Sequence, residues 1–472
     1  MPVALHVTVV SDTERQCGMD YTPCRREEEE EMLSRRGFLS VASVPIAVPA
    51  MAANWSKFRG PDSTGVPANE AGLPETWSAT ENVAWKAVIG GSGWSSPITW
   101  GERVFLTSAH ASSMTATPEG GFYQGAVESP RPEDEHRWLA HCIELGTGKE
   151  MWQTELHRGV PKVGRHRKNS YASETCVTDG ERLYGHVGDL GTWCVDYDGK
   201  LLWSKDWPPV RTRWAYGTAS SPALHGGRLY ITNDSEDQSY LVALDKLTGQ
   251  EIWRVDREEP TTWSTPFIWE SGERTEIITM GREKLRSYDL DGKVLWELSR
   301  LSSLAIPTPF SSGGLLYVTS GYMNSQERPI YAIRPGASGD ISLPEGVTSN
   351  EYIAWSVPQG GPYHPSGLVY RGLYYTLFDR GFLTCHDAKT GEEVYGKQRV
   401  SRDSRNFTAS PWAYNGKLFC LDEAGTTFVI QAGPEFKLLG ANELGEMCMA
   451  TPAVVDSGLL IRTYSTLYKI AS

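Results

Sequence analysis

The stretch LVALDKLTGQEIW, residues 241–253, decides the fold, because two short apolar segments flank a turn and the second ends in tryptophan. Alternating apolar residues before Asp245 predict a strand, and Thr248-Gly249 predict the turn of a hairpin. The same pattern recurs as CIELGTGKEMW, CVDYDGKLLW, SYDLDGKVLW and CHDAKTGEEVY. A hairpin that returns with the same turn and a terminal aromatic residue indicates a repeated structural unit.

Two further strands complete each unit. A small or polar residue before proline marks the first strand, as in WSSPITW, SSPALHG, WSTPFIW, IPTPFSS, TASPWAY and MATPAVV. The second strand follows a turn and occurs eight times, as ERVFLTS, ERLYGHV, GRLYITN, EIITMG, GLLYVTS, GLYYTLF, GKLFCLD and GLLIRTY. Eight units of four short strands predict an all-β fold, an eight-bladed β-propeller of four-stranded antiparallel blades.

The two ends of the repeated region predict how the ring closes. The last unit stops at LYKIAS, which corresponds to a third strand, and residues 81–89, ENVAWKAVI, form an unpaired fourth strand. We therefore expect this N-terminal strand to complete the last blade, since closure removes an exposed sheet edge. Residues 54–472 then form a single propeller, with insertions at 109–136 in the first blade and 334–350 in the fifth.

The segment before the propeller has the composition of an export signal. Residues 32–53 place Arg35 and Arg36 before a short apolar run with an Ala-Met-Ala end, which resembles a twin-arginine signal. We expect cleavage near Ala52/Ala53, export to the periplasm and no transmembrane segment. Residues 1–31 show no periodicity, so we expect them to be disordered and to precede the true translation start.

Composition and spacing argue against several classes of function. The net charge of −13 disfavours nucleic acid and anionic lipid as partners. The ten histidines lack metal-ligand spacing. The segments DYDGK and DLDGK begin like a calcium loop, which needs glutamate at its twelfth position. Trp207 and Arg300 stand at that position, so we interpret both segments as hairpin turns. We expect no metal site, buried free thiols at the six cysteines after residue 53, and a monomer.

The motif itself resembles a known family. Ala243, Gly249 and Trp253 fit an A-x-D-x-x-T-G-x-x-x-W pattern that is similar to the tryptophan-docking motif of PQQ-like propeller repeats, a family that includes BamB and quinoprotein dehydrogenases. WSKFRGPDSTGV and EMCMATPA also resemble exported propellers of planctomycete-type bacteria. The resemblance implies that these residues join neighbouring blades, as do four further tryptophans: Trp85, Trp152, Trp203 and Trp296.

Two functions follow from the resemblance. One is a non-catalytic binding or assembly module of the bacterial cell envelope, which needs no cofactor. The alternative is a PQQ-dependent dehydrogenase that oxidises alcohols or sugars with PQQ and calcium. Members of the second group resemble one another in a vicinal cysteine pair, and this chain has no Cys-Cys, so we favour the binding module and assign no catalytic residue. A polysaccharide-active enzyme also stays open, because paired carboxylates need not be close in sequence.

Candidate binding residues lie where the repeats differ from one another. Loops 164–174 and 211–221 mix cations with aromatic side chains, which is typical of recognition surfaces. The basic cluster at 165–168 suggests an acidic protein or an anionic small molecule or glycan as the partner; the alternative is that these residues only pack between blades. The candidates are Arg165, His166, Arg167, Lys168, Asn169, Tyr171, Glu174, Arg211, Arg213, Trp214, Tyr216, Tyr322, Tyr363, His364, Arg380 and Phe407.

Overall fold

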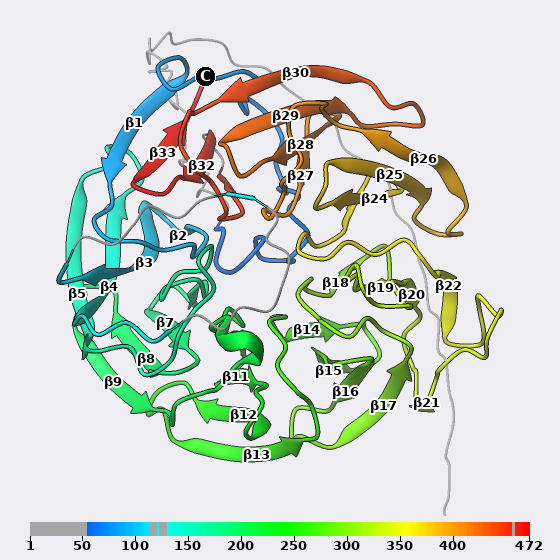
Figure 1. Ribbon diagram of the computed structural model, residues 1–472, viewed down its shortest axis with the longest axis horizontal. Helices are drawn as coiled ribbons and strands as arrows, with labels where there is room; N and C mark the ends of the chain where they lie inside the picture. The colour runs from blue at the N-terminus through cyan, green and yellow to red at the C-terminus, as the bar shows by residue number, and fades with distance from the viewer. Residues whose placement is uncertain (1–53, 114–119, 122–129, 456–457) are drawn as a thin grey trace, which may run out of the picture. The chain divides into compact units, whose positions relative to one another are not determined.

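Eight antiparallel sheets are arranged around one axis in the computed structural model, which describes residues 54–113, 120–121, 130–455 and 458–472 (Figure 1). The predicted export signal and the segment before it lie outside these residues. Each sheet has four strands in simple up-and-down order, and one of the eight carries a fifth. The prediction of an all-β, eight-bladed propeller is confirmed.

The strands, blade by blade from the inside outward, have the following bounds. The first blade holds β2 (Ile98–Trp100), β3 (Arg103–Ala111), β4 (His136–Glu144) and β5 (Glu150–Gly159); the second, β6 (Val177–Thr178), β7 (Arg182–Val187), β8 (Gly191–Asp196) and β9 (Leu201–Asp206). The third holds β10 (Ala223–His225), β11 (Arg228–Asn233), β12 (Ser239–Asp245) and β13 (Glu251–Arg257); the fourth, β14 (Phe267–Glu270), β15 (Thr275–Met280), β16 (Lys284–Tyr288) and β17 (Val294–Ser299). The fifth holds β18 (Phe310–Ser312), β19 (Leu315–Thr319), β20 (Ile330–Ile333) and β22 (Ile353–Val357); the sixth, β23 (Leu368–Tyr370), β24 (Leu373–Phe378), β25 (Phe382–Asp387) and β26 (Glu393–Arg399). The seventh holds β27 (Trp412–Tyr414), β28 (Lys417–Leu421), β29 (Thr426–Gln431) and β30 (Leu438–Glu443); the eighth, β31 (Ala453–Val455), β32 (Gly458–Arg462), β33 (Thr466–Ile470) and β1 (Val83–Val88).

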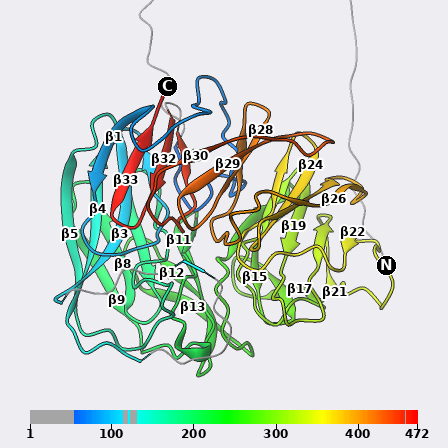
Figure 2. The same ribbon diagram turned by 45° about the horizontal axis from the view of Figure 1, so that its top comes forward.

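The eighth blade is closed by the N-terminal strand, as predicted. β1 runs antiparallel to β33, with Val83 opposite Ile470 and Val88 opposite Thr466. Figures 1 and 2 both show the blue strand β1 beside the red strand β33. The described residues include no helix that is long and apolar enough to cross a membrane; the 3-10 turn η1 (Arg213–Ala215) is the helical element among them.

The motif at 241–253 joins neighbouring blades. Gly249 has φ +70°, and a Cβ there would lie 2.5 Å from Cε3 of Trp203 in the preceding blade. The Trp203 indole N–H donates to the carbonyl of Lys246 at 3.1 Å. Trp85, Trp152, Trp253 and Trp355 also donate to a turn carbonyl of the following blade. Each indole therefore covers the hairpin turn of the next blade, where only glycine leaves room for it.

Trp296 departs from this pattern because the insertion at 334–350 replaces the turn it would cover. Its indole N–H donates to Glu276 Oε2 at 2.6 Å, within its own blade. The insertion supplies β21 (Gly339–Asp340), which pairs in parallel with β17 and places Gly339 opposite Trp296. The insertion lies between strands of the fifth blade, as expected, but its strand is added to the fourth.

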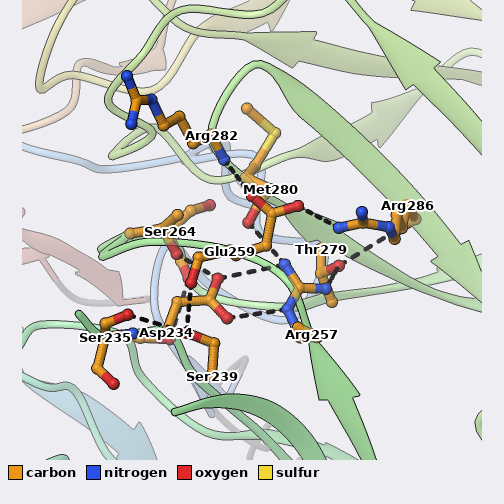
Figure 3. A network of polar contacts seen from close by, with 12 residues as sticks. Asp234, Ser235, Ser239, Arg257, Glu259, Ser264, Thr279, Met280, Arg282 and Arg286 are labelled. Atoms are coloured by element: carbon orange, nitrogen blue, oxygen red, sulfur yellow. Dashed lines mark hydrogen bonds and ion pairs between the residues drawn. The ribbon is translucent and has the colours of Figure 1, made fainter. Parts of the chain in front are cut away.

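A buried ion pair of the third blade is hydrogen-bonded to the fourth blade (Figure 3). The Arg257 guanidinium contacts Asp234 at 2.9 Å, and the two side chains are 1% and 0% exposed. Arg257 also donates to Thr279 Oγ1 at 2.5 Å and to Tyr288 Oη at 2.9 Å, both in the fourth blade. Each polar atom therefore has a partner where water is excluded, which makes the pair a structural joint.

The segment before β1 crosses the inner strands at one end of the axis. Thr99 of the first blade donates its N–H to the carbonyl of Trp55 at 2.9 Å, and Thr178 of the second blade to that of Ser56 at 3.0 Å. The buried Arg59 donates to the carbonyl of Gly367, at the sixth blade, at 2.6 Å. This segment therefore connects blades on opposite sides of the ring and closes one end of the axis.

Candidate functional site

A cavity of about 650 Å³ lies on the propeller axis and is lined by residues from all eight blades. Its deepest layer is a ring of eight hydroxyl groups, one at the head of each inner strand. Neighbouring blades are bonded through this ring: the N–H of Ser96 donates to Thr175 Oγ1 at 3.0 Å, and that of Thr175 to Ser221 Oγ at 2.9 Å. The eight residues are Ser96, Thr175, Ser221, Thr265, Thr308, Ser366, Ser410 and Thr451.

The hydroxyl ring has unused donor capacity. In six of the eight joints a backbone N–H donates to the hydroxyl oxygen of the next blade. Within the described residues, these six oxygens only accept, so their O–H groups remain to donate into the cavity. The ring explains the small polar residue before proline in the sequence, which marks the inner wall as well as the start of a strand.

A second layer lies two residues earlier in every blade, since residues i and i+2 of an extended chain share a face. Its composition is mixed, with two tryptophans, one histidine, and small or apolar residues. The layer consists of Trp94, Ser173, Ala219, Trp263, Ile306, His364, Thr408 and Met449. The wall therefore changes from polar near the floor to largely apolar above it. Phe58 of the crossing segment lines the closed end.

Aromatic side chains gather at the open mouth of the cavity. The rings of Trp214 and Tyr216 have centroids 5.3 Å apart, and those of His166 and Tyr216 are 4.6 Å apart. Across the mouth, the centroids of Tyr322 and Tyr363 are separated by 5.2 Å. Burial raises the pKa of Tyr363, so its hydroxyl stays protonated. These rings present flat apolar faces with polar edges to the cavity.

The backbone at Trp214 is strained. Trp214 has φ +54° and Ala215 has φ +50°, values in the left-handed region that side-chain-bearing residues rarely adopt. Thr212 holds the turn, since its carbonyl accepts from the Ala215 N–H and its hydroxyl from the Gly217 N–H. Strain of this kind costs on the order of 1–3 kcal/mol per residue and clusters at ligand-binding sites. The turn fixes the Trp214 ring at the cavity mouth.

Among the described residues that line the cavity, the single lysine is already neutralised. Lys168 Nζ contacts Glu423 Oε1 of the seventh blade at 2.5 Å, and the Glu423 side chain is 4% exposed. Glu423 also accepts from the Thr408 hydroxyl at 2.7 Å and from the Gly121 N–H at 2.8 Å. The predicted basic cluster is therefore not gathered in the cavity. Arg165 turns back onto its own loop and lies over the Tyr171 ring at 4.9 Å, while Arg167 is exposed outside.

Two histidines at the mouth, His166 and His364, are oriented by hydrogen bonds. His364 Nδ1 contacts the Asp379 carboxylate, which also accepts from the N–H groups of Tyr363 and His364 at 2.8 and 3.1 Å. This contact places a proton on Nδ1 and fixes the orientation of the ring. His166 Nδ1 accepts from the Lys168 N–H at 3.2 Å, so its Nε2 carries the proton. Burial lowers the pKa of His166 to about 4, which keeps it neutral.

The structure places half of the predicted binding residues in the cavity wall: His166, Lys168, Asn169, Trp214, Tyr216, Tyr322, Tyr363 and His364. The others lie elsewhere. Tyr171, Glu174 and Phe407 are buried between strands, and Arg211 pairs with Asp237 at 3.0 Å. Arg213 lies over the Trp214 ring at 4.4 Å, whereas Arg380 is exposed. Sequence reasoning missed the hydroxyl ring, Trp94, Trp263 and Phe58.

The cavity does not fit the calcium-bound anionic cofactor PQQ. A calcium ion needs several oxygen ligands, usually including carboxylates, yet no three His, Cys, Asp or Glu side chains gather into a metal-binding group anywhere in the described ranges. An unpaired cation would favour a bound anion, but Lys168, the cationic side chain among the described lining residues, is held by Glu423. The six cysteines beyond residue 53 are free and buried, with no two adjacent. These residues therefore offer neither the metal ligands nor the charge that such a cofactor requires.

Comparisons with known proteins show that the repeats are similar to those of BamB. A family model described as outer membrane protein assembly factor BamB matches residues 236–395. BamB of Nitrosomonas eutropha is 26% identical over 149 residues, which cover 29% of this chain and 34% of that protein, so this chain spans about a third of that relative. BamB of Yersinia pestis is 21% identical over 333 residues, covering 62% of this chain and 80% of that protein.

Solved structures show the same fold. BamB from Moraxella catarrhalis superposes with a TM-score of 0.50 at 11% identity, covering 73% of this chain and 96% of that one. Quinohemoprotein alcohol dehydrogenase from Comamonas testosteroni gives a TM-score of 0.57 at 12% identity, covering 88% and 80%. At such identities the likeness extends to the fold alone. With its docking motifs, its closed eight-bladed ring and its match to the BamB model over residues 236–395, the chain is an eight-bladed β-propeller whose repeats are similar to PQQ-like, BamB-like repeats.

Proposed function

We propose that this protein is a non-catalytic binding module of the bacterial cell envelope that holds its partner at the open mouth of the axial cavity. The observation that carries the proposal is the cavity itself, which has an aromatic mouth, a polar inner ring and one closed end. A concave site with apolar walls and a few oriented polar groups is typical of ligand binding. Because a ring of blades is rigid, the mouth keeps its shape between partners.

The relatives support the cellular setting. Both relatives carry the name outer membrane protein assembly factor. We therefore expect the partner of this chain to lie in the envelope, and an envelope protein is one candidate. The twin-arginine pair Arg35 and Arg36 adds an export route to the periplasm. The dehydrogenase alternative draws support from the shared fold of the quinohemoprotein neighbour, but the cavity residues give it none.

The proposal is tested by capture from envelope extracts. The purified mature protein is immobilised and compared with the double variant Trp214→Ala/Tyr322→Ala, which removes two aromatic faces from the mouth. Tyr352→Ala serves as the matched control, because Tyr352 is half-buried in the fifth blade and lies outside the cavity wall. We expect the mouth variant to lose its captured partner and the control to retain it.

Identical capture by all three proteins would refute the assignment of the mouth. Catalysis is tested separately, by incubating the protein with PQQ and calcium and following dye-linked oxidation of alcohols and sugars. Saturable PQQ binding accompanied by turnover would overturn it.

A further inference from the structure

We propose that the axial cavity binds the terminal units of an uncharged oligosaccharide. This inference rests on the proposed binding function and names the chemical class of the ligand. Three properties of the wall carry it: the absence of an unpaired charge among the described lining residues, a set of hydroxyl groups that both donate and accept, and flat aromatic faces at the mouth.

The charge of the wall disfavours an ionic ligand. Lys168 is the single permanently charged side chain among the described lining residues, and Glu423 neutralises it at 2.5 Å in a buried site. Separating this pair would leave a buried carboxylate without its cation, which is costly. His166 is held neutral by burial. An anion or a cation would therefore lose its hydration in the cavity and gain no opposite charge.

The hydroxyl ring matches the hydrogen-bonding character of a sugar. Each ring oxygen that accepts a backbone N–H keeps one O–H to donate and a second lone pair to accept. A sugar hydroxyl likewise donates and accepts, so the two sets can pair without leaving a buried group unsatisfied. An entirely apolar ligand would leave the ring hydroxyl groups without hydrogen-bond partners.

The aromatic mouth supplies the complementary apolar surface. One face of a pyranose ring consists of C–H groups, which pack against the electron-rich face of an indole or phenol. Trp214 and Tyr216 on one side, and Tyr322 and Tyr363 on the other, provide such faces at the entrance. Trp94 and Trp263 continue them inward.

The shape of the cavity indicates recognition of a chain end. Its volume of about 650 Å³ falls in the range of about 300–1,000 Å³ found for small-ligand sites. The segment that carries Trp55, Ser56 and Phe58 bonds to the first and second blades and closes the opposite end. A glycan therefore enters from the mouth and stops at the hydroxyl ring, rather than threading through the propeller.

The experiment measures binding of defined probes to the mature protein by calorimetry and tryptophan fluorescence. The neutral probes are cellotetraose, maltotetraose and chitotetraose; the charged probes are tetragalacturonate and choline chloride. We expect saturable binding of at least one neutral probe, weakened about tenfold in Trp214→Ala, an effect equal to about 1.4 kcal/mol, and unchanged in Tyr352→Ala. Affinity should also stay constant between about 50 and about 500 mM salt, because no ion pair forms with the ligand.

Each alternative outcome overturns the inference in a recognisable way. Binding of no neutral probe refutes it, as does tighter mouth-dependent binding of tetragalacturonate or choline. If envelope capture depends on Trp214 and Tyr322 while the sugars fail to bind, the proposed binding function stands and a polypeptide is the occupant. If neither capture nor sugar binding depends on the mouth, both proposals fail.

Discussion

Replacing Gly249 by alanine tests how tightly the docking tryptophan couples neighbouring blades. Gly249 has φ +70°, and an added Cβ would lie 2.5 Å from Cε3 of Trp203, well inside normal contact distance. The left-handed backbone costs an alanine about 1–2 kcal/mol, and overpacking a close contact costs about 1–3 kcal/mol more. We therefore expect Gly249→Ala to lower the free energy of unfolding by about 2–5 kcal/mol.

Gly226 provides the matched control. It also has a positive φ, +56°, but a Cβ there would meet no atom within 4 Å. Gly226→Ala should show the backbone cost alone, about 1–2 kcal/mol. Equilibrium urea unfolding of both variants, followed by circular dichroism, measures the difference. Losses that agree within about 0.5 kcal/mol would refute the view that Trp203 packs rigidly on this turn.

Three further predictions concern other parts of the chain. Asp234→Ala should lower the free energy of unfolding by about 3–5 kcal/mol, because it leaves the buried Arg257 charge without its partner. The double variant Asp234→Ala/Arg257→Met should lose less stability. An equal or larger loss in the double variant would contradict the view that the unpaired charge causes the loss. Burial raises the pKa of Glu174 from 4.5 to about 7, so the folded state binds more protons than the unfolded state between these values, and stability should fall as pH rises through this window. Glu174→Gln should flatten that fall in thermal melts between pH 5 and pH 8, and parallel curves would contradict the assignment. Replacing Arg35 and Arg36 by lysine should leave the protein in the cytoplasm on fractionation, whereas normal periplasmic recovery would exclude the twin-arginine route.

The repeated joints could be predicted from sequence because the same physical requirement occurs many times. Gly249 and Trp253 recur at fixed spacing in several units, and β1 was recognisable as the strand that the last unit lacks. The exception at Trp296 was not predictable, since β21 pairs with a strand of the preceding blade. Such a pairing depends on the path of a loop and has no periodic pattern.

The candidate site was predictable only in part. The aromatic residues of loops 164–174 and 211–221 stood out because they differ from the repeat, and several of them line the cavity. The partner of Lys168 did not stand out, because Glu423 is 255 residues away in sequence. The hydroxyl ring was visible as a small residue before proline, but its function emerges only when eight copies converge on one axis.

Because β1 pairs with β33, the ring can close only after the whole chain has been synthesised. Residues 83–88 leave the ribosome early and have no partner until residues 466–470 follow them. A chain that stops short of its last strand keeps two unpaired edges, which favour association with other strands and recognition by proteases. Full-length molecules therefore differ from truncated ones in having no unpaired strand edge in the eighth blade.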